Sequence, residues 1–180
     1  MEVAAVIAER SNCLKAHVGA IIATDNRIRA VGYNGTVAGY KDCFDGGCER
    51  CRNRTVSGGQ KLDQCVCVHA EQNALVSAAR YGIAVDNSEC WVTHEPCLDC
   101  TKLLIQSGIR IVHYLSAYPY EGNPGQAKRR QDARHHSEVK NLTIFKSERD
   151  NLRNSALLED RLADMKQLAQ RYATKHKIWI

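Results

Sequence analysis

The chain has 180 residues, of which 44% are hydrophobic and 25% charged, so it is long enough for one globular domain with an extension. It contains no apolar run near the roughly 20 residues of a membrane helix, and its start lacks the basic region of a secretion signal. The net charge of +5 is uneven, with −1 over residues 1–125 and +6 over 126–180. We therefore expect a near-neutral domain over 1–125, a basic extension over 126–180 and no membrane partner.

The first part of the chain predicts one helix and a hairpin. Residues 2–10 are amphipathic, and the apolar, β-branched segments 18–23 and 28–32 flank Asp25 and Asn26, which favour a tight turn. Residues 33–67 are rich in Gly, Cys and Asn and show no periodicity, which predicts a long loop. So long a loop in a compact domain needs an anchor, and a metal ion is the usual one.

Helical and extended patterns then alternate. Residues 70–81 and 97–107 predict helices, and residues 89–93 and 109–115 predict strands. A strand-helix-strand order of this length predicts a parallel crossover connection. The domain is therefore expected to be an α/β sandwich.

The end of the chain predicts a helical extension. A boundary is expected at 116–126, and residues 139–145 favour a last edge strand. A capping box at Ser147 precedes a long helix whose apolar stripe would pack on the domain or on a neighbouring subunit.

Nine cysteines are many for this length. A secreted disulfide scaffold is one alternative, but the count is odd and no signal peptide is visible. Two pairs, Cys48-x-x-Cys51 and Cys97-x-x-Cys100, have the spacing with which two thiolates hold one cation. We expect metal binding in a reducing, cytoplasmic compartment, and Cys90, in a predicted strand, as a buried apolar side chain.

Two motifs at predicted helix starts, H-A-E and P-C-L-D-C, carry candidate zinc ligands. Catalytic zinc takes three protein ligands and one water, and His69, Cys97 and Cys100 supply three. The positive end of a helix dipole favours the thiolate form of both cysteines. The set therefore predicts a catalytic zinc site.

Glu71 follows the histidine by two residues and so faces the same cavity without binding the metal. It can take the proton of zinc-activated water and pass it to the substrate as the catalytic residue. The alternative is a structural zinc site with an incidental glutamate.

The paired motifs H-x-E and P-C-x-x-C are typical of zinc nucleobase deaminases. The chain resembles the deoxycytidylate (dCMP) deaminase family, including the deaminase of bacterial competence operons. The histidine argues against the small cytidine deaminases, which have cysteine there. The matching pieces span about residues 4–118 and are R-S-N-C (10–13), V-G-A (18–20), G-Y-N-G (32–35), H-A-E-Q-N-A (69–74), T-H-E-P-C-x-x-C (93–100) and Q-S-G-I (106–109).

The resemblance implies a cytidine-deaminase-like three-layer sandwich, with a central mixed sheet flanked by helices, and commonly a homohexamer. It implies that Asn34 binds the deoxyribose, that the Ala70 backbone N–H binds the base carbonyl and that Tyr118 lines the nucleotide pocket. Alternatively, Asn34 holds a left-handed turn and Tyr118 is a core residue.

A monophosphate substrate needs a cation and donors for its oxygens, for which Arg10 and Ser11 are the candidates. A solvated Arg10 is the alternative. The G-Y-N-G loop also matches the place where family members bind the regulators dCTP and dTTP.

Competence-operon relatives imply a second, structural zinc site. Its ligands would be Cys13, Cys43, Cys48 and Cys65, a set that ties the loop to the first helix. Cys51 or Cys67 could substitute in this set, and free core thiols are the alternative.

The resemblance thus implies a zinc-dependent hydrolase that converts dCMP and water to dUMP and ammonia in pyrimidine deoxynucleotide metabolism. The alternatives are a deaminase of dCTP or a modified cytosine nucleotide, a deaminase of a base in RNA or single-stranded DNA, and a zinc-stapled interaction module. A nucleic-acid substrate would need stacking aromatics and a basic groove. Only 6% of the residues are aromatic, and the catalytic part carries −1, so we expect no nucleic-acid partner.

Overall fold

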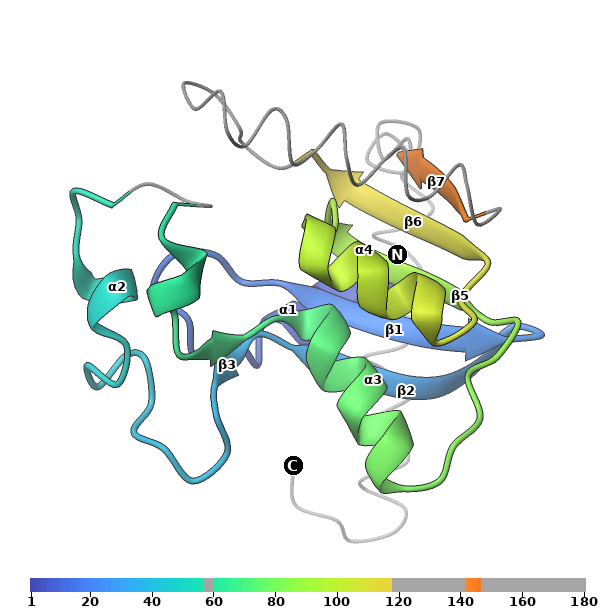
Figure 1. The fold of residues 1–180 in the computed structure, drawn as a ribbon, viewed down its shortest axis with the longest axis horizontal. Coiled ribbons are helices and arrows are strands. Elements are labelled where there is room, and N and C mark those ends of the chain that lie inside the picture. Colours follow the sequence, from blue (N-terminus) through green and yellow to red (C-terminus); the bar gives the residue numbers. More distant parts are fainter. Residues whose placement is uncertain (57–59, 118–141, 147–180) are drawn as a thin grey trace, which may run out of the picture. The chain divides into compact units, whose positions relative to one another are not determined.

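A five-stranded sheet lies at the centre of the fold, in the order β2-β1-β5-β6-β7 (Figure 1). The computed structural model describes residues 1–56, 60–117 and 142–146. In that part of the chain, the sheet strands are β1 (Gly19–Thr24), β2 (Arg27–Tyr33), β5 (Glu89–His94), β6 (Ile111–Ser116) and β7 (Thr143–Lys146). β1 is antiparallel to β2 and to β5, whereas β6 is parallel to β5 and to β7, so the sheet is mixed.

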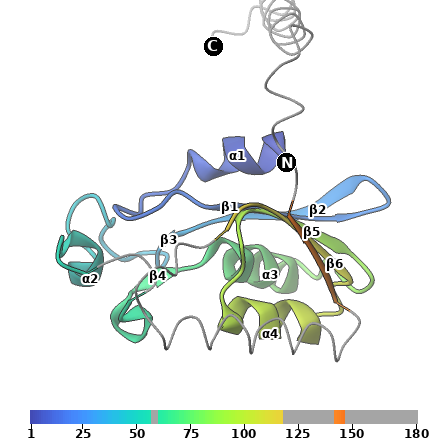
Figure 2. The same ribbon diagram turned by 90° about the horizontal axis from the view of Figure 1, so that it is seen from above.

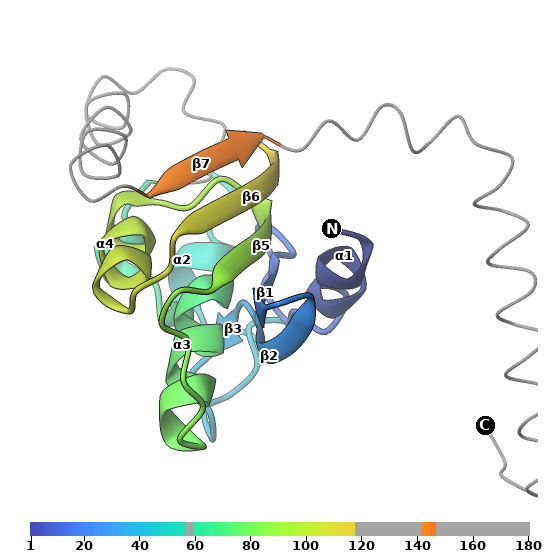
Figure 3. The same ribbon diagram turned by 90° about the vertical axis from the view of Figure 1, so that its right-hand side faces the viewer.

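Three helices cover the two faces of this sheet. α1 (Glu2–Ala8) lies on one face, and α3 (Ala70–Arg80) and α4 (Leu98–Gln106) lie together on the other (Figure 2). Figure 3, turned to the side, shows the same order, with the sheet between α1 on one side and α3 and α4 on the other. The predicted three-layer α/β sandwich is confirmed.

Two glycines let the outer helices approach the sheet backbone. A Cβ atom at Gly19 would lie 2.1 Å from the Ala4 carbonyl oxygen of α1, and one at Gly32 would lie 2.2 Å from the Ala70 carbonyl oxygen of α3. Both distances are far below van der Waals contact, so any side chain there would displace a helix. The first turn of α3 is therefore held directly against β2.

The core between the sheet and the α3–α4 layer is apolar. Ile22, Val92, Leu104 and Val112 are completely buried there. Cys90 is also completely buried in this core, as predicted. Nowhere among the described residues is there a helix with the length and apolar character needed to cross a bilayer.

Local turn chemistry explains the hairpin. Asp25 and Asn26 join β1 to β2 with φ angles of 51° and 59°, the left-handed conformation of a two-residue hairpin turn. The predicted turn is therefore confirmed. The pairing between the two strands shifts register between Ile22 and Ala23.

The segment expected as a loop, residues 33–67, contains regular structure. A second, two-stranded sheet joins β3 (Gly35–Thr36) to β4 (Cys67–Val68), and between them lie α2 (Glu49–Arg52) and the 3₁₀ turn η1 (Leu62–Gln64). Elements of two to four residues are too short to give a hydrophobic period, so the sequence pattern could not show them.

The predicted C-terminal extension lies mostly outside the described residues. Of the expected edge strand, β7 is described, and it pairs parallel with β6. The helical extension predicted within 126–180 and its packing stay predictions.

Candidate active site

The three predicted zinc ligands come together from two helix starts. His69 directly precedes α3, Cys97 directly precedes α4, and Cys100 lies in the first turn of α4. Nδ1 of His69 is 3.5 Å from Sγ of Cys97 and 3.4 Å from Sγ of Cys100. The three donor atoms lie within 4.8 Å of one another, close enough to share one ion.

Two further side chains, neither of them predicted to have a role, hold these helix starts. The Gln72 side-chain oxygen accepts a hydrogen bond of 3.0 Å from the His69 backbone N–H, and the Thr101 hydroxyl donates one of 3.0 Å to the Cys97 carbonyl. Gln72 stands at the third helix position, where a capping box places Glu or Gln, and this signal could have identified it.

The electrostatics of the triad suit a cation. Hydrogen bonding from the Cys100 thiol, together with the neighbouring His69, lowers the pKa of Cys97 to about 4. The same contact between the sulfurs raises the pKa of Cys100. The two sulfurs therefore share one negative charge, and a divalent cation would stabilise the second thiolate. One imidazole and two thiolates are the donor set of a catalytic zinc site, and they leave a fourth position open.

Glu71 lies beside this triad in the first turn of α3. It is only 4% exposed, and burial raises the pKa of its carboxyl group to about 6. Such a value suits a group that must both accept and donate a proton near neutral pH.

The two residues expected to hold the sugar and the base lie at the same end of the fold. Ala70, which is completely buried, is the first residue of α3, so its N–H has no acceptor within the helix. Asn34 accepts a hydrogen bond of 2.7 Å from the Val18 N–H and donates one of 2.8 Å to the Ala16 carbonyl. Its φ is not positive, so the alternative of a left-handed turn is wrong. A bond of 2.7 Å from the Asn73 side chain to the Tyr33 carbonyl ties α3 to this point.

The structure separates the two phosphate candidates. Arg10 is exposed, whereas Ser11 is buried, with its hydroxyl accepting a bond of 3.2 Å from the Cys13 N–H. Arg10 is therefore the candidate with an available side chain. Tyr118 lies outside the described residues.

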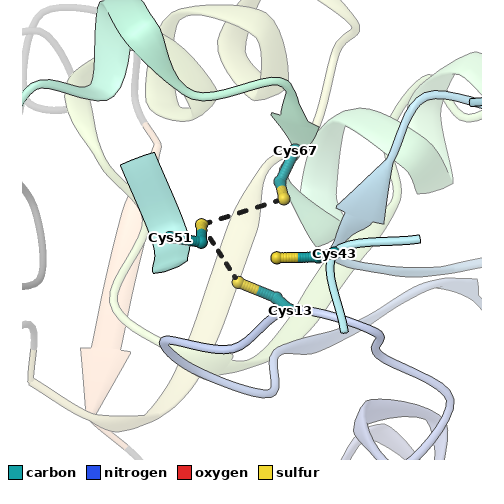
Figure 4. Close-up of side chains that lie close together, drawn as sticks. All are labelled: Cys13, Cys43, Cys51 and Cys67. Atoms are coloured by element: carbon teal, nitrogen blue, oxygen red, sulfur yellow. Dashed lines mark hydrogen bonds between the residues drawn. The ribbon is translucent and has the colours of Figure 1, made fainter. Parts of the chain in front are cut away.

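Six other cysteines gather in a second cluster. The predicted set combines Cys13, Cys43, Cys48 and Cys65, for which Cys51 or Cys67 could substitute. The structure forms two groups of four thiols, each within 4.8 Å, and both groups include Cys51 and Cys67. One group is Cys13, Cys43, Cys51 and Cys67, and the other is Cys48, Cys51, Cys65 and Cys67. Figure 4 shows the first group with its sulfur atoms directed toward one another.

Comparison with known proteins supports a zinc centre. A family model of the cytidine and deoxycytidylate deaminase zinc-binding region matches residues 1–116. The deoxycytidylate deaminase of Schizosaccharomyces pombe is 44% identical over 118 residues, which cover 66% of this chain and 36% of that protein. ComE operon protein 2 of Bacillus subtilis is 40% identical over 114 residues, which cover 63% of this chain and 55% of that protein. The chain therefore spans only part of the length of these curated relatives.

A solved structure matches over nearly its whole length. The dCMP deaminase from the cyanophage S-TIM5, crystallised in complex with dCMP and dUMP, superposes with a TM-score of 0.63 at 31% sequence identity. The match covers 81% of this chain and 92% of that one.

Proposed function

This chain belongs to the family of cytidine and deoxycytidylate deaminase zinc-binding regions, and on that premise we propose that it hydrolyses dCMP to dUMP and ammonia. The observation that carries the proposal is the open triad of His69, Cys97 and Cys100 with the buried carboxyl group of Glu71 beside it. A structural metal site needs no such carboxyl group, whereas a hydrolytic site needs one to move protons.

The proposed roles follow from the chemistry of the residues. Zinc, when bound by the triad, supplies a Lewis acid that makes water acidic near neutral pH. Glu71 accepts a proton from the attacking water and delivers protons to the ring nitrogen and the leaving amine. The water oxygen first adds to C4 while the ring nitrogen N3 takes a proton, and the bond from C4 to the protonated amine then breaks, so that ammonia leaves and a carbonyl remains at C4.

The remaining proposed contacts orient the substrate. The Ala70 N–H donates to the base carbonyl, and Asn34 contacts the deoxyribose from the end of β2. Arg10 pairs with the phosphate, so a nucleotide should be preferred over a nucleoside. Tyr118 would add an aromatic side to the pocket.

The setting of the enzyme is part of the same proposal. All nine cysteines are unpaired, which suits a reducing compartment such as the cytoplasm. The chain functions as a homo-oligomer, a hexamer by resemblance, and its G-Y-N-G segment at 32–35 is the candidate contact for dCTP or dTTP as regulators. The basic extension within 126–180 packs on the domain or on a neighbouring subunit.

Ammonia release from four compounds tests the substrate. The purified protein is incubated with dCMP, dCTP, deoxycytidine and a cytosine-bearing oligonucleotide. We expect the highest kcat/KM for dCMP. A preference for dCTP or the oligonucleotide would refute the assignment to dCMP while keeping the deaminase chemistry. No ammonia from any cytosine compound would refute the deaminase.

A further inference from the structure

The six-cysteine cluster, which comprises Cys13, Cys43, Cys48, Cys51, Cys65 and Cys67, has no part in the proposed reaction. Its members come from the segment after α1, from the loop around α2 and from the segment that ends in β4. Five of the six are buried and Cys65 is half-buried. So many thiols packed together away from solvent require an explanation of their own.

The distances between the sulfur atoms are those of a tetrahedral zinc-thiolate site. With zinc–sulfur bonds of about 2.3 Å, the edge of the tetrahedron is about 3.8 Å. Sγ of Cys51 lies 3.8 Å from Sγ of Cys13, 3.7 Å from that of Cys65 and 4.0 Å from that of Cys67. Sγ of Cys48 lies 3.8 Å from Sγ of Cys65. A disulfide bond is only about 2.05 Å long, so none of these contacts is one.

The two groups of four thiols share a pair, Cys51 and Cys67. Figure 4 draws this pair together with Cys13 and Cys43. Six donors therefore form two groups of four with one common pair, the arrangement that two ions need when two thiolates bridge them. We propose that the cluster binds two zinc ions, with Cys51 and Cys67 coordinated to both. Cys13 and Cys43 complete the shell of one ion, and Cys48 and Cys65 complete the shell of the other.

A single zinc ion would leave part of the cluster without a role. An ion held by the first group leaves Cys48 and Cys65 as thiols beside it, and an ion held by the second group leaves Cys13 and Cys43. Binding the second ion replaces two thiol protons by one divalent cation, so it adds no net charge to the buried cluster.

Neighbouring donors also fit a cluster with excess negative charge. The Arg50 guanidinium lies 3.9 Å from Sγ of the bridging Cys51, and the Leu14 backbone N–H lies 3.4 Å from Sγ of Cys43. Arg50 is buried, and its Nε and Nη2 atoms donate to the Gln60 carbonyl at 2.9 and 2.6 Å. A cation and an N–H group directed at sulfur stabilise thiolates, and six thiolates with two zinc ions carry a net charge of two minus.

The cluster is placed to position the proposed active site. The bridging Cys67 precedes the triad ligand His69 by two residues and lies in β4. β4 pairs with β3, which begins directly after Asn34. Two zinc ions at the cluster would thus fix the segments that carry a metal ligand and a substrate contact.

Elemental analysis of the purified full chain tests the number of ions. We expect three zinc ions per chain in the wild type, one in the triad and two in the cluster, and two in His69→Ala. Cys43→Ala and Cys48→Ala, which each remove a ligand of one ion only, should lower the content by at most one. Cys90→Ala removes a buried cysteine outside both groups and should keep all three. Two zinc ions in the wild type, or iron in place of zinc, would overturn the proposal.

Bridging is tested without any variant by cadmium NMR. Protein loaded with an NMR-active cadmium isotope should give two cluster resonances that split each other through the shared sulfur atoms. Two unsplit resonances would contradict the shared pair. Neither measurement involves turnover, so an inactive protein with three zinc ions would refute only the proposed function, and an active protein with two would refute only the cluster.

Discussion

The two cysteine-rich regions of the molecule differ in how many donors they direct at one point. The triad joins one imidazole and two sulfurs, and a buried carboxyl group lies beside it. The six-cysteine cluster offers four sulfurs at each of two points. An ion with three protein ligands keeps a position for water, whereas an ion with four is closed. The number of donors, rather than the choice of metal, therefore separates a site for chemistry from a site for stability.

The largest expected effect comes from a substitution that removes the proton-transfer group and leaves both metal sites intact. Glu71→Gln should lower kcat by about 10²–10⁴-fold, because the amide keeps the shape of the carboxyl group but cannot carry a proton. The zinc content, measured by elemental analysis, should stay that of the wild type. Glu89→Gln makes the same chemical change at the start of β5 and should leave kcat unchanged. Activity of Glu71→Gln within about threefold of wild type would show that another group moves the proton.

The complementary substitution removes a ligand from the six-cysteine cluster and leaves the proposed active site unchanged. Cys48→Ala should lower the free energy of unfolding by about 4 kcal/mol or more, because loss of a bound metal is among the most destabilising changes. Chemical denaturation measures this effect. The ion held by Cys13, Cys43, Cys51 and Cys67 still keeps β4 in place, so kcat per folded molecule should change little. Cys90→Ala, the matched control, should cost far less, since it leaves only a small cavity. Equal losses for the two variants would mean that Cys48 is an ordinary core residue.

A third prediction concerns the segment that leads from the proposed active site to the cluster. Arg10 precedes the cluster ligand Cys13 by three residues. Arg10→Ala should reduce the preference for dCMP over deoxycytidine by roughly 10–150-fold, because only the substrate with a phosphate loses a charged partner. The ratio of the two kcat/KM values measures this preference.

Arg27→Ala serves as the control for this prediction. Arg27 is an exposed arginine at the opposite end of β2 from Asn34, so its loss should leave the preference unchanged. If Arg10→Ala slows both substrates equally, Arg10 supports α1 and the phosphate is bound by another group.

The smallest expected effect distinguishes stabilisation by hydrogen bonds near the cluster from stabilisation by the bound metal. Lys15 donates two bonds of 2.8 Å to the carbonyls of Asn53 and Val56 and so also fastens the loop. Lys15→Met should cost about 1–3 kcal/mol of unfolding free energy, with unchanged zinc content. Lys41→Met, at an exposed lysine of the same loop, should cost nothing measurable. Loss of zinc from Lys15→Met would show that the cluster depends on this tie.

Long periodic segments made the central fold predictable from the sequence. The helix expected at 70–81 is observed at Ala70–Arg80, and the strand expected at 89–93 is observed at Glu89–His94. The triad was predictable for a related reason. Each motif stands at the start of such a helix, so local spacing already places its side chains on one end of the element.

The cluster was less predictable because its contacts are not local. Spacing shows that Cys48 and Cys51 can share an ion, but not that Cys51 of α2 and Cys67 of β4 lie together. The β3–β4 pair that places Cys67 has two residues in each strand, too few for a recognisable pattern. The roles of Gln72 and Thr101 depend similarly on the helix ends being known. The contacts of Asn34 were not predictable for another reason. Its two hydrogen bonds to residues 16–18 depend on how the sheet brings these segments together, and not on a local turn at Asn34.

The common pair of the cluster has a consequence for the order in which the chain assembles. Cys48, Cys51, Cys65 and Cys67 lie within about twenty residues of one another, whereas Cys13 is distant in the chain from both bridging residues. Closing a shorter loop costs less conformational entropy, so the first ion should be captured by the nearer four. The two bridging sulfurs then supply two of the four ligands of the second ion. Cys13 and Cys43 bind last and complete its coordination. On this route, an early local event draws the N-terminal helix and the loop into place before the long-range sheet contacts are complete.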